Sequence, residues 1–531
     1  MRLVPVLAVT LLTFDAAFAT PDEPVVRKDL TPNELSAYVE QLTSNGQIIT
    51  DLNVRVVERR AVFDVLSQAN PDQRPWLIQV NIGDKEFSSS SRKYKADGFK
   101  NTVHRFIPNG REKLHSTIWV QNVEAAESLT LPRAPVPSTG ELGQDLEPIN
   151  DLLVKMLKDN NLPGATVAVS RNGRMIYDRG FGYSDLKTKT LMNPNSVMRI
   201  ASISKPITAV AILLLMEDDK LRLDDPVMNY LVRDKKFELP KDADAAWSRV
   251  TVRNLLQHSG GWDRKKSKDP MFELLEITRA LDLQKTARTP DIVRYQLSRP
   301  LDFEPGSKYE YSNFGYSLLG RVIEVASGTT YESYVTERIL KPTGMTQTRL
   351  GKTKLTDRAD DEVFYYSQQI RKYPAIWDVA SENKSGKFES VLGPYGHWDL
   401  EVMDSHGAWT STASDLVRFA IAIDAETNAL IQPESLRVIK ERPSFCSASD
   451  ATWYGLGWNV RSIDGVEEVN LWHSGLVAGS STILVKRSDN CAWAVLFNVN
   501  DTKNGETCSA VIDAPMHEAV DESLPRLTIE D

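Results

Sequence analysis

The chain has 531 residues, with 63 Lys and Arg against 72 Asp and Glu, so its formal net charge at pH 7 is −9. This acidic balance excludes a nucleic-acid binder that relies on a broad basic surface. Hydrophobic residues make up 41% and charged residues 25%, and the 28 Gly and 27 Pro are scattered, which excludes a fibrous or low-complexity protein. The length favours about two to four domains around a sizeable core.

The first residues have the pattern of a secretory signal peptide. Arg2 supplies a positive charge, residues 3–14 form a short apolar run, and Ala17 and Ala19 mark a small-residue cleavage site. The run is too short to cross a bilayer, which needs about 20 apolar residues. We therefore expect residues 1–19 to be removed near Ala19. The protein would then be exported, to a periplasm or outside the cell, without stable membrane insertion. The alternative is a buried N-terminal strand or helix.

Residues 20–130 contain two similar units, each with a helix followed by two strands. Thr31, Pro32 and Glu34 form a capping-box pattern that begins the first helix. An Asn-Gly turn at residues 109–110 predicts that the strands of the second unit form a hairpin. The expected elements are a helix at 31–45 with strands at 48–57 and 61–66, then a helix ending at 97–98 with strands at 102–107 and 113–120.

An offset of 52 residues relates the two units and suggests an internal duplication. It superposes Gly46 on Gly98, Thr50 on Thr102 and Asn70 on Asn122. Because these units contain no obvious pair of nucleophile and base, we expect them to form a small α/β accessory domain. Residues 94–121 also resemble the tandem-repeat modules that precede the catalytic domain in the polyglycine hydrolases.

Residues 131–140 carry three prolines, which predicts a linker to a large α/β (α+β) domain at 141–531. Strands are expected at both ends of this domain, with helices between them, so one sheet should be assembled from N- and C-terminal segments. The expected elements are a helix at 146–157, strands at 165–170 and 175–179, and four late strands at 454–460, 467–472, 480–485 and 493–498.

The only cysteines are Cys446, Cys491 and Cys508. They are too few for a disulfide-built scaffold, and they lack the spacing of a zinc site. An oxidising compartment is compatible with one bridge in any of three pairings, and the sequence does not choose among them.

Ser202 and Lys205 begin a segment that predicts a buried helix. Residues 203–215 are apolar on nearly all faces, and Pro206 is tolerated only in a first helical turn, which puts Ser202 at the N-terminus. Residues three apart are neighbours on a helix, so the Lys205 amine reaches the Ser202 hydroxyl. Burial favours the neutral amine, which can act as a base.

The Ser-x-x-Lys pattern alone is a weak signal, because the chain contains three other copies. They lie at residues 90–93, 184–187 and 381–384, in polar, turn-rich surroundings where a solvated surface is the expected role. The apolar context alone distinguishes the copy that starts at Ser202.

Tyr311 and Asn313 form the only Tyr-x-Asn pattern in the chain. They follow Pro-Gly at residues 305–306, so we expect a loop that leads into a helix at 314–325. A phenol beside Lys205 can hold the proton of a serine and return it to a leaving group. The Asn313 amide can donate to a substrate carbonyl. Taken alone, a tyrosine covering the core and an asparagine in a turn explain the pattern equally well.

His473 and Gly475 follow the predicted strand at 467–472, at what we expect to be its end. Glycine at a strand edge leaves room for a substrate to lie alongside, and the N–H of Leu476 could help to form an oxyanion hole. Removing one such donor typically costs about 3–4 kcal/mol of transition-state stabilisation. The same tripeptide at residues 258–260 follows a helix, and we expect it to shape the fold around the site.

Ser-x-x-Lys, Tyr-x-Asn and His-x-Gly, in this order, resemble the β-lactamase-like serine hydrolases. These include class C β-lactamases, D-Ala-D-Ala carboxypeptidases, D-aminopeptidases and related esterases. The resemblance covers about residues 141–514, including 255–260 and 406–416, and implies an antiparallel sheet flanked by helices. It implies that Ser202 is the nucleophile, that Lys205 and Tyr311 move the proton, and that Asn313, His473 and Gly475 contact substrate beside Leu476.

One residue departs from the family pattern. Many β-lactamases and carboxypeptidases have a lysine at the position of His473, where its charge holds the substrate carboxylate. Histidine, with an ordinary pKa near 6.5, is mostly neutral at pH 7 and anchors a carboxylate less well. We therefore expect the substrates to be esters, or amides without a terminal carboxylate at that spot. The acyl-enzyme reaction itself requires no metal or organic cofactor, and we expect none.

The leading interpretation is an exported serine hydrolase that cleaves an ester or peptide-type amide bond through a Ser202 acyl-enzyme. Its substrate would be a small molecule or a peptide, with cell-wall material as one source. The first alternative is a β-lactamase or a penicillin-binding D-Ala-D-Ala carboxypeptidase. The second is a catalytically inactive binding protein. The sequence leaves the oligomeric state open.

Overall fold

The computed structural model describes most of the chain. The described residues are 6–9, 24–58, 60–70, 74–96, 99–110, 112–121, 127–132, 135–140, 146–233, 244–370, 372–377, 389–424, 429–463 and 465–524. Contacts divide the chain into two compact units, Met1–Ser128 with Gln369–Val391, and Leu129–Gln368 with Leu392–Asp531. In the part of the chain so described, every helix is too short or too polar to span a membrane.

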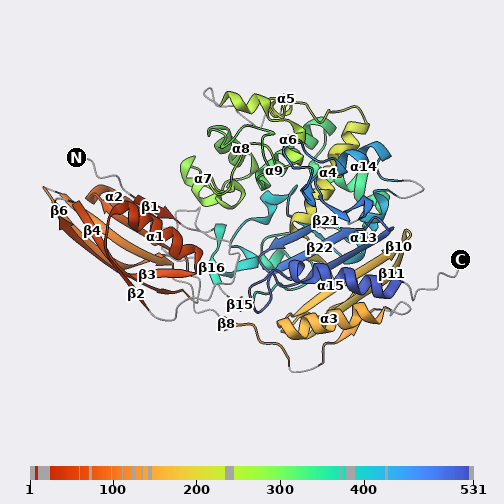
Figure 1. Cartoon of the computed structure of the whole chain (residues 1–531), viewed down its shortest axis with the longest axis horizontal. Helices are drawn as coiled ribbons and strands as arrows, with labels where there is room; N and C mark the ends of the chain where they lie inside the picture. Colours follow the sequence, from red (N-terminus) through yellow and green to blue (C-terminus); the bar gives the residue numbers. More distant parts are fainter. Residues whose placement is uncertain are drawn as a thin grey trace. The chain divides into compact units, whose positions relative to one another are not determined.

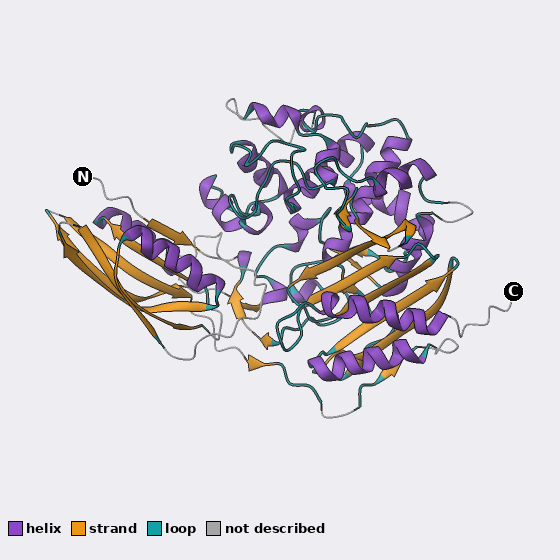
Figure 2. Ribbon diagram, viewed as in Figure 1, coloured by secondary structure: helices purple, strands orange, loops and turns teal. Residues whose placement is uncertain are grey.

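The first unit contains the order strand, helix, strand, strand twice. Figure 2 shows the strands of the protein in orange and its helices in purple. The elements are β2 (Val25–Leu30), α1 (Pro32–Ser44), β3 (Gln47–Val57) and β4 (Arg60–Ala69), then β5 (Trp76–Ile82), α2 (Asp84–Ala96), β6 (Phe99–Asn109) and β7 (Glu112–Gln121). The first residues of α1 and α2, of β3 and β6, and of β4 and β7 each lie 52 residues apart. The duplication suggested by the sequence therefore extends to the secondary structure.

The start of α1 is confirmed in atomic detail. The Thr31 hydroxyl accepts a hydrogen bond from the Glu34 N–H at 3.4 Å, and the Glu34 carboxylate accepts one from the Thr31 N–H at 2.9 Å. The predicted hairpin is also present, because Asn109 of β6 pairs with Glu112 of β7. The two helices belong to a unit whose core includes buried Phe63 and Ile118.

The N-terminal segment is described only in part. β1 (Val6–Val9) pairs antiparallel with β5, and the other residues of the predicted signal peptide lie outside the described ranges. The signal peptide therefore stays a prediction. The likeness of residues 94–121 to polyglycine-hydrolase modules is likewise unconfirmed.

One antiparallel sheet organises the second unit (Figure 1). Strands from both ends of the unit meet where β10 pairs with β23, so the expected sheet of N- and C-terminal segments is confirmed. The strands in spatial order are β12 (Thr190–Leu191), β11 (Arg174–Asp185), β10 (Gly164–Arg171), β23 (Cys491–Phe497), β22 (Ser480–Lys486), β21 (Val466–Val477), β20 (Asn459–Ile463) and β19 (Thr452–Tyr454).

Helices cover both faces of this sheet. α3 (Glu147–Asn160) and α15 (Cys508–Ser523) pack on one face, with Val167 and Val495 in the shared core. Successive side chains on a strand point to opposite faces. Val167 faces the core shared with α3 and α15, so the next residue, Ala168, faces the other side of the sheet. Asp178, the pairing partner of Ala168, contacts Ser414 of α13 (Ala413–Ala422). α13 therefore covers the other face.

Two predicted strands differ from the structure. The expected strand at 454–460 is wrong, since residues 455–458 form a break between β19 and β20. Glycines explain the break: a Cβ at Gly455 would lie 1.9 Å from the Ile439 carbonyl oxygen, and Gly457 has a φ of +80°. In contrast, the strand expected at 467–472 continues to Val477, so His473 and Gly475 lie within β21 rather than beyond its end.

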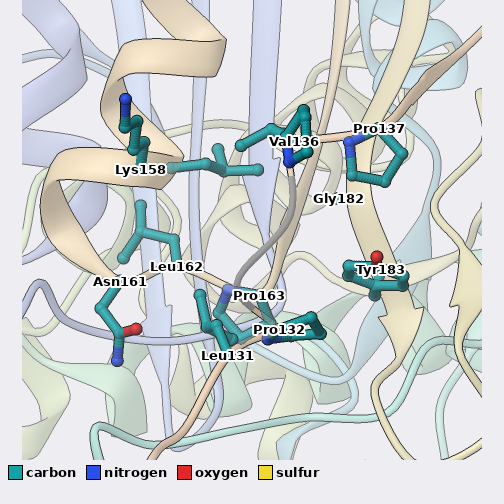
Figure 3. Close-up of a pocket in the computed structure, with 12 residues that line it drawn as sticks. Leu131, Pro132, Val136, Pro137, Lys158, Asn161, Leu162, Pro163, Gly182 and Tyr183 are labelled. Carbon is teal, nitrogen blue, oxygen red and sulfur yellow. The ribbon is translucent and has the colours of Figure 1, made fainter.

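Part of the predicted linker packs on the second unit. β9 (Ser138–Thr139) pairs with β11, and Val136 contacts the core beneath the sheet. A cavity of about 200 Å³ separates this segment from the end of α3 (Figure 3). Its lining is Leu131, Pro132, Pro135, Val136, Pro137, Leu157, Lys158, Asn161, Leu162, Pro163, Gly182 and Tyr183.

All three cysteines are free thiols in the structure. Cys491 and Cys508 are buried, and Cys446 is half-buried. Burial raises the pKa of the Cys491 thiol to about 12.

Candidate active site

Ser202 lies in a sharp turn between a short strand and the buried helix. β13 (Met198–Arg199) leads into a 3₁₀ turn, η1 (Ala201–Ile203), which is followed by α4 (Ser204–Glu217). Ala201 has a φ of +47°, a left-handed conformation that costs about 1–2 kcal/mol for a residue with a Cβ. Ser202 therefore lies two residues before the start of α4, close to the predicted position.

The helix that follows Ser202 is buried, as predicted. Every residue of α4 from Ser204 to Leu215 is buried, including Lys205, which has no exposed surface. Pro206 lies in the first turn, where its missing N–H breaks no helical hydrogen bond. The lysine amine thus projects from a helix that is anchored on all sides.

Two predicted site residues, Lys205 and Tyr311, converge on the Ser202 hydroxyl. The Lys205 Nζ lies 3.0 Å from Ser202 Oγ, and the Tyr311 hydroxyl lies 2.7 Å from the same oxygen. Lys205 Nζ also donates to Asn313 Oδ1 at 2.8 Å and to the His406 carbonyl oxygen at 3.0 Å. Residues more than a hundred positions apart in the sequence therefore form one hydrogen-bonded cluster.

Burial sets the protonation states of this cluster. It lowers the pKa of the Lys205 amine well below its ordinary value of 10.5, against the opposing effect of the Asp269 carboxylate. It raises the pKa of the Tyr311 phenol well above 10, although the hydrogen bond with Ser202 opposes the shift. The favoured resting state at neutral pH is a neutral phenol beside an amine that loses its proton easily.

Asn313 is positioned by a residue that no motif predicted. It is the first residue of α9 (Asn313–Ser327), whose N-cap is Ser312, so the predicted loop-to-helix transition is confirmed. Its side-chain Nδ2 donates to Asp269 Oδ2 at 2.9 Å, which turns its Oδ1 toward Lys205. Burial raises the pKa of the Asp269 carboxyl, and the Asn313 hydrogen bonds oppose this shift. Sequence reasoning missed Asp269 because it belongs to a separate loop with no recognisable spacing.

β21 lies against the turn that carries Ser202. A Cβ at Gly475 would lie 2.1 Å from the Ile200 carbonyl oxygen and 2.3 Å from Thr482 Oγ1, so only glycine fits there. Thr482, the partner of Gly475 on β22, donates to the same Ile200 oxygen at 3.0 Å. The next residue, Leu476, has a side chain that is 51% exposed. The strand edge is thus adjacent to Ser202, as the sequence predicted.

His473 is neutral and engaged within the protein. Its Nε2 lies 2.9 Å from the Tyr454 hydroxyl, and its Nδ1 lies 2.6 Å from the Ser474 carbonyl oxygen. Burial, and then the Lys205 charge, lower the pKa of the ring to about 3. The predicted weakness of His473 as a carboxylate anchor therefore has a structural cause. Tyr454 is a further site neighbour that the sequence did not indicate.

The second His-Ser-Gly copy supports the site without touching Ser202. His258 Nδ1 accepts a hydrogen bond from the Ser312 N–H at 3.1 Å, and its ring centroid lies 4.2 Å from that of Tyr311. Burial lowers the pKa of His258 well below 6.5. It shapes the loop that carries Tyr311, as expected.

The other Ser-x-x-Lys copies form no comparable cluster. The Ser90 hydroxyl donates to the Phe87 carbonyl, and the Ser184 hydroxyl donates to those of Thr190 and Leu191. The copy at 381–384 lies outside the described residues. In the described ranges, no group of three or more His, Cys, Asp or Glu side chains could hold a metal ion.

Comparison with known proteins identifies the family of the chain. The family model described as Beta-lactamase matches residues 149–514, more than half of the chain. The chain therefore belongs to the beta-lactamase family, a family of serine hydrolases that includes penicillin-binding proteins.

Two curated relatives illustrate the match. Penicillin-binding protein 4* of Bacillus subtilis (strain 168) is 28% identical over 372 residues, which cover 69% of this chain and 74% of the relative. Protein flp of Staphylococcus aureus (strain COL) is 25% identical over 357 residues, covering 66% of this chain and 63% of the relative. The chain thus spans less than two thirds of the length of protein flp.

Solved structures share the fold at low sequence identity. The octameric penicillin-binding protein homologue from Pyrococcus abyssi has a TM-score of 0.53 and 22% identity, covering 71% of this chain and 78% of that one. The D-amino acid amidase from Ochrobactrum anthropi SV3 has a TM-score of 0.53 and 22% identity, covering 72% and 100%. EstCE1, a hydrolase with promiscuous acyltransferase activity, has a TM-score of 0.55 and 19% identity, covering 71% and 98%. The predicted β-lactamase/transpeptidase-like fold is confirmed.

Proposed function

We propose that this protein is an exported serine hydrolase that cleaves an ester or a peptide-type amide through an acyl-enzyme on Ser202. The observation that carries the proposal is the contact of one hydroxyl, Ser202 Oγ, with both the Lys205 amine at 3.0 Å and the Tyr311 phenol at 2.7 Å. A nucleophile needs a base within hydrogen-bond reach, and here that base is itself oriented by further groups.

The protonation states support a division of labour between the two groups. Lys205, in the neutral form that burial favours, takes the proton from Ser202 as its oxygen bonds to the substrate carbonyl carbon. Tyr311 keeps its proton in the resting enzyme and donates it to the leaving group as the bond to that group breaks. The proton on Lys205 then restores the phenol, so that charge and protons balance.

The strand edge supplies the remaining functions in this proposal. The backbone N–H groups of Ser202 and Leu476 would stabilise the oxyanion, and Asn313 would donate to the substrate amide or carbonyl. A water molecule, activated by Lys205 and Tyr311, would then release the acyl group. No step in this sequence needs a metal or an organic cofactor.

The environment of His473 favours substrates without a carboxylate at the strand edge. The ring is neutral at physiological pH, because its pKa is lowered to about 3, and Tyr454 occupies its Nε2. Esters and amides that are neutral at this position therefore fit better than β-lactams with a carboxylate there.

Substitution of the nucleophile tests the proposal. We expect Ser202→Ala to lower kcat on a p-nitrophenyl ester by at least about 10³-fold, by analogy with other serine nucleophiles, without loss of fold. The matched control is Ser184→Ala, which changes another Ser-x-x-Lys serine in the same unit and should leave kcat unchanged. Full activity in Ser202→Ala would refute the assignment.

The similarity to Penicillin-binding protein 4* favours a second candidate, a penicillin-binding carboxypeptidase or a β-lactamase. A fluorescent penicillin separates the candidates. Stable labelling of Ser202 would favour a penicillin-binding carboxypeptidase, rapid turnover would favour a β-lactamase, and no reaction would favour the esterase or amidase. If neither penicillin nor any ester reacts, the inactive binding protein becomes the better account.

A further inference from the structure

A charged side chain lies in the protein interior three residues before the nucleophile. Arg199 is the last residue of β13, and it has no exposed surface. Its Nε lies 3.7 Å from Oε1 of Glu362, which is buried as well. Burial of an ion pair removes both charges from water, and such a pair adds little stability compared with apolar packing. Stability alone therefore does not explain why this pair is buried.

The guanidinium of this arginine joins segments that are far apart in the sequence. Its Nη1 donates to the Pro394 carbonyl oxygen, and its Nη2 donates to that of Lys352 at 2.8 Å. Its carbon lies 4.6 Å from the ring centroid of Tyr365 and 5.6 Å from those of Tyr395 and Trp398. A lysine does not reproduce this arrangement, because its ammonium is a compact point charge without a planar fork.

Side chains also fix the backbone of Arg199. Its N–H donates to the Tyr365 hydroxyl at 2.8 Å, and that hydroxyl donates to Glu362 Oε1 at 2.7 Å. Its carbonyl oxygen accepts a hydrogen bond from Ser480 Oγ of β22 at 2.6 Å. Tyr365 therefore holds both the backbone and the guanidinium of the same residue.

The backbone of Ile200, the next residue, is fixed as well. Its N–H donates to the Trp409 carbonyl oxygen at 2.9 Å, and its carbonyl oxygen accepts from Thr482 Oγ1 at 3.0 Å. Ala201, with its left-handed φ of +47°, follows and leads directly into Ser202. A strained backbone conformation persists only where the surrounding structure determines it. Residues 199 and 200 supply that support on the N-terminal side of the turn.

We propose that Arg199 is a positioning residue for catalysis, whose buried guanidinium holds the turn so that the Ser202 hydroxyl stays against Lys205 and Tyr311. This inference rests on the proposed function and adds to it a residue that does not touch the reacting atoms. Arg199 acts through the backbone of residues 199–201, which carries the nucleophile to its place.

The role of Arg199 is geometric rather than electrostatic. Burial lowers the pKa of the Lys205 amine, Asp269 raises it, and Arg264 lowers it further. The charge of Arg199 is instead compensated locally, by Glu362 and by two carbonyl oxygens. A misplacement of about 1 Å far from the chemistry can cost about 10²-fold in rate. We therefore expect changes at Arg199 to affect kcat and to leave the titration of the base unchanged.

A conservative substitution tests this role. Arg199→Lys keeps a positive charge near Glu362 but loses the planar fork, and it should lower kcat on p-nitrophenyl butyrate about 10- to 100-fold. KM should change by less than about threefold, because no contact with substrate is removed. The pH at which kcat/KM falls should be that of the wild type. Phosphonylation of Ser202 by a fluorophosphonate should slow in parallel with kcat.

A second variant makes a smaller change at the same place. Tyr365→Phe keeps the aromatic ring and removes only the hydroxyl that accepts from the Arg199 N–H. It should lower kcat by about 2- to 10-fold, again with KM unchanged. If Arg199→Lys does not fold, this variant decides: a lower kcat supports the proposal, and a wild-type kcat overturns it.

The matched control is Arg179→Lys, at another buried arginine of the same unit. The Arg179 guanidinium donates to the Thr139 carbonyl oxygen and to Asn150 Oδ1. It also lies 5.5 Å from the centroid of the Phe181 ring. Arg179 belongs to β11, which three strands of the sheet separate from β21. This variant should lose stability in urea denaturation, as Arg199→Lys does, with kcat unchanged.

Three results would overturn the proposal. The first is a wild-type kcat in folded Arg199→Lys. The second is an equal loss of kcat in Arg179→Lys, which would mean that activity follows stability. The third is a shift in the pH at which kcat/KM falls, which would mean that the charge of Arg199 acts on the base. Failure of the proposed function has a different signature, in which Ser202→Ala hydrolyses p-nitrophenyl butyrate as fast as the wild-type protein.

Discussion

The reactivity of the site depends on how single residues are buried. Lys205 has no exposed surface, and its amine lies within hydrogen-bond distance of neutral oxygen atoms of Ser202, Asn313 and His406. An ammonium group in such surroundings loses solvation that these contacts do not replace, so its pKa falls. Asp269 opposes the fall, but its oxygen is bonded to the Asn313 amide. Burial therefore favours the neutral amine that the proposed mechanism uses as a base.

The lowered pKa of Lys205 predicts a specific pH dependence. Below this pKa the amine is protonated and cannot accept the Ser202 proton, so kcat/KM should fall as pH falls through it. Because the pKa lies well below 10.5, the plateau should be reached well below pH 10.5. A profile that keeps rising up to pH 10.5 would contradict a depressed lysine pKa.

Two variants identify the group that titrates. Lys205→Arg, whose guanidinium stays protonated, should lower kcat/KM by about 10²- to 10⁴-fold at every pH. His473 has a pKa of about 3 and should not titrate near neutrality. The fall of kcat/KM at low pH should therefore occur at the same pH in His473→Asn as in the wild type. If it moved to another pH, the titrating group would be the histidine instead.

At the scale of elements, three secondary-structure ends meet at the site. η1 and α4 carry Ser202 and Lys205, the N-terminus of α9 carries Asn313, and β21 supplies the edge at Gly475. Each end is held by polar contacts as well as by packing. The Ser312 hydroxyl, for example, accepts a hydrogen bond from the Gly315 N–H at 3.1 Å.

The N-cap of α9 provides a test at this scale. Ser312→Ala should lower the free energy of unfolding by about 0.5–2 kcal/mol, because the cap is lost. It should also lower kcat, since Ser312 lies between Tyr311 and Asn313.

The control is Thr330→Ala, which removes the N-cap of α10 (Tyr331–Val335), where Thr330 Oγ1 accepts from the Ser333 N–H at 3.2 Å. This variant should lose similar stability in urea denaturation with kcat unchanged. An equal kcat loss in both variants would mean that the effect is not specific to the site.

The sequence predicted elements where local signals were strong. The capping box located α1, the apolar run located α4, and the Asn-Gly turn located the hairpin of β6 and β7. The strand expected at 454–460 failed because hydrophobic pattern does not reveal that Gly455 and Gly457 pack against other backbone and side-chain atoms. Such contacts exist only in the folded chain.

The same limit applies to the candidate site. Two of the three motifs predicted Ser202, Lys205, Tyr311 and Asn313, whose convergence on one cluster the structure shows. Asp269 and Tyr454 have no motif, since they reach the site from other loops and strands. Their roles depend on tertiary contacts, and a single sequence carries no local sign of these.

At the scale of the whole molecule, a unit of the beta-lactamase family is joined to a unit built from a repeated arrangement. The family match covers residues 149–514, and the repeat lies before it, with an offset of 52 residues between equivalent elements. Residues 369–391 belong to the first compact unit although the family match surrounds them in sequence. We propose that the first unit is an accessory domain rather than part of the catalytic machinery.

Export is also a property of the whole chain, and it can be tested by mass. If the signal peptide functions, protein recovered from the periplasm or medium of an expressing bacterium should lack residues 1–19 and begin near Thr20. Intact-mass spectrometry measures this directly. Protein that remains in the cytoplasm with residues 1–19 attached would contradict the prediction.

The most direct test of the central claim is to identify the residue that becomes acylated or phosphonylated. The purified protein is treated with a fluorophosphonate probe, and the adduct is located by peptide mass spectrometry. We predict one adduct on Ser202, absent in Ser202→Ala and unchanged in Ser184→Ala. Labelling at a different residue, or no labelling while a known serine hydrolase reacts beside it, would contradict the proposed mechanism.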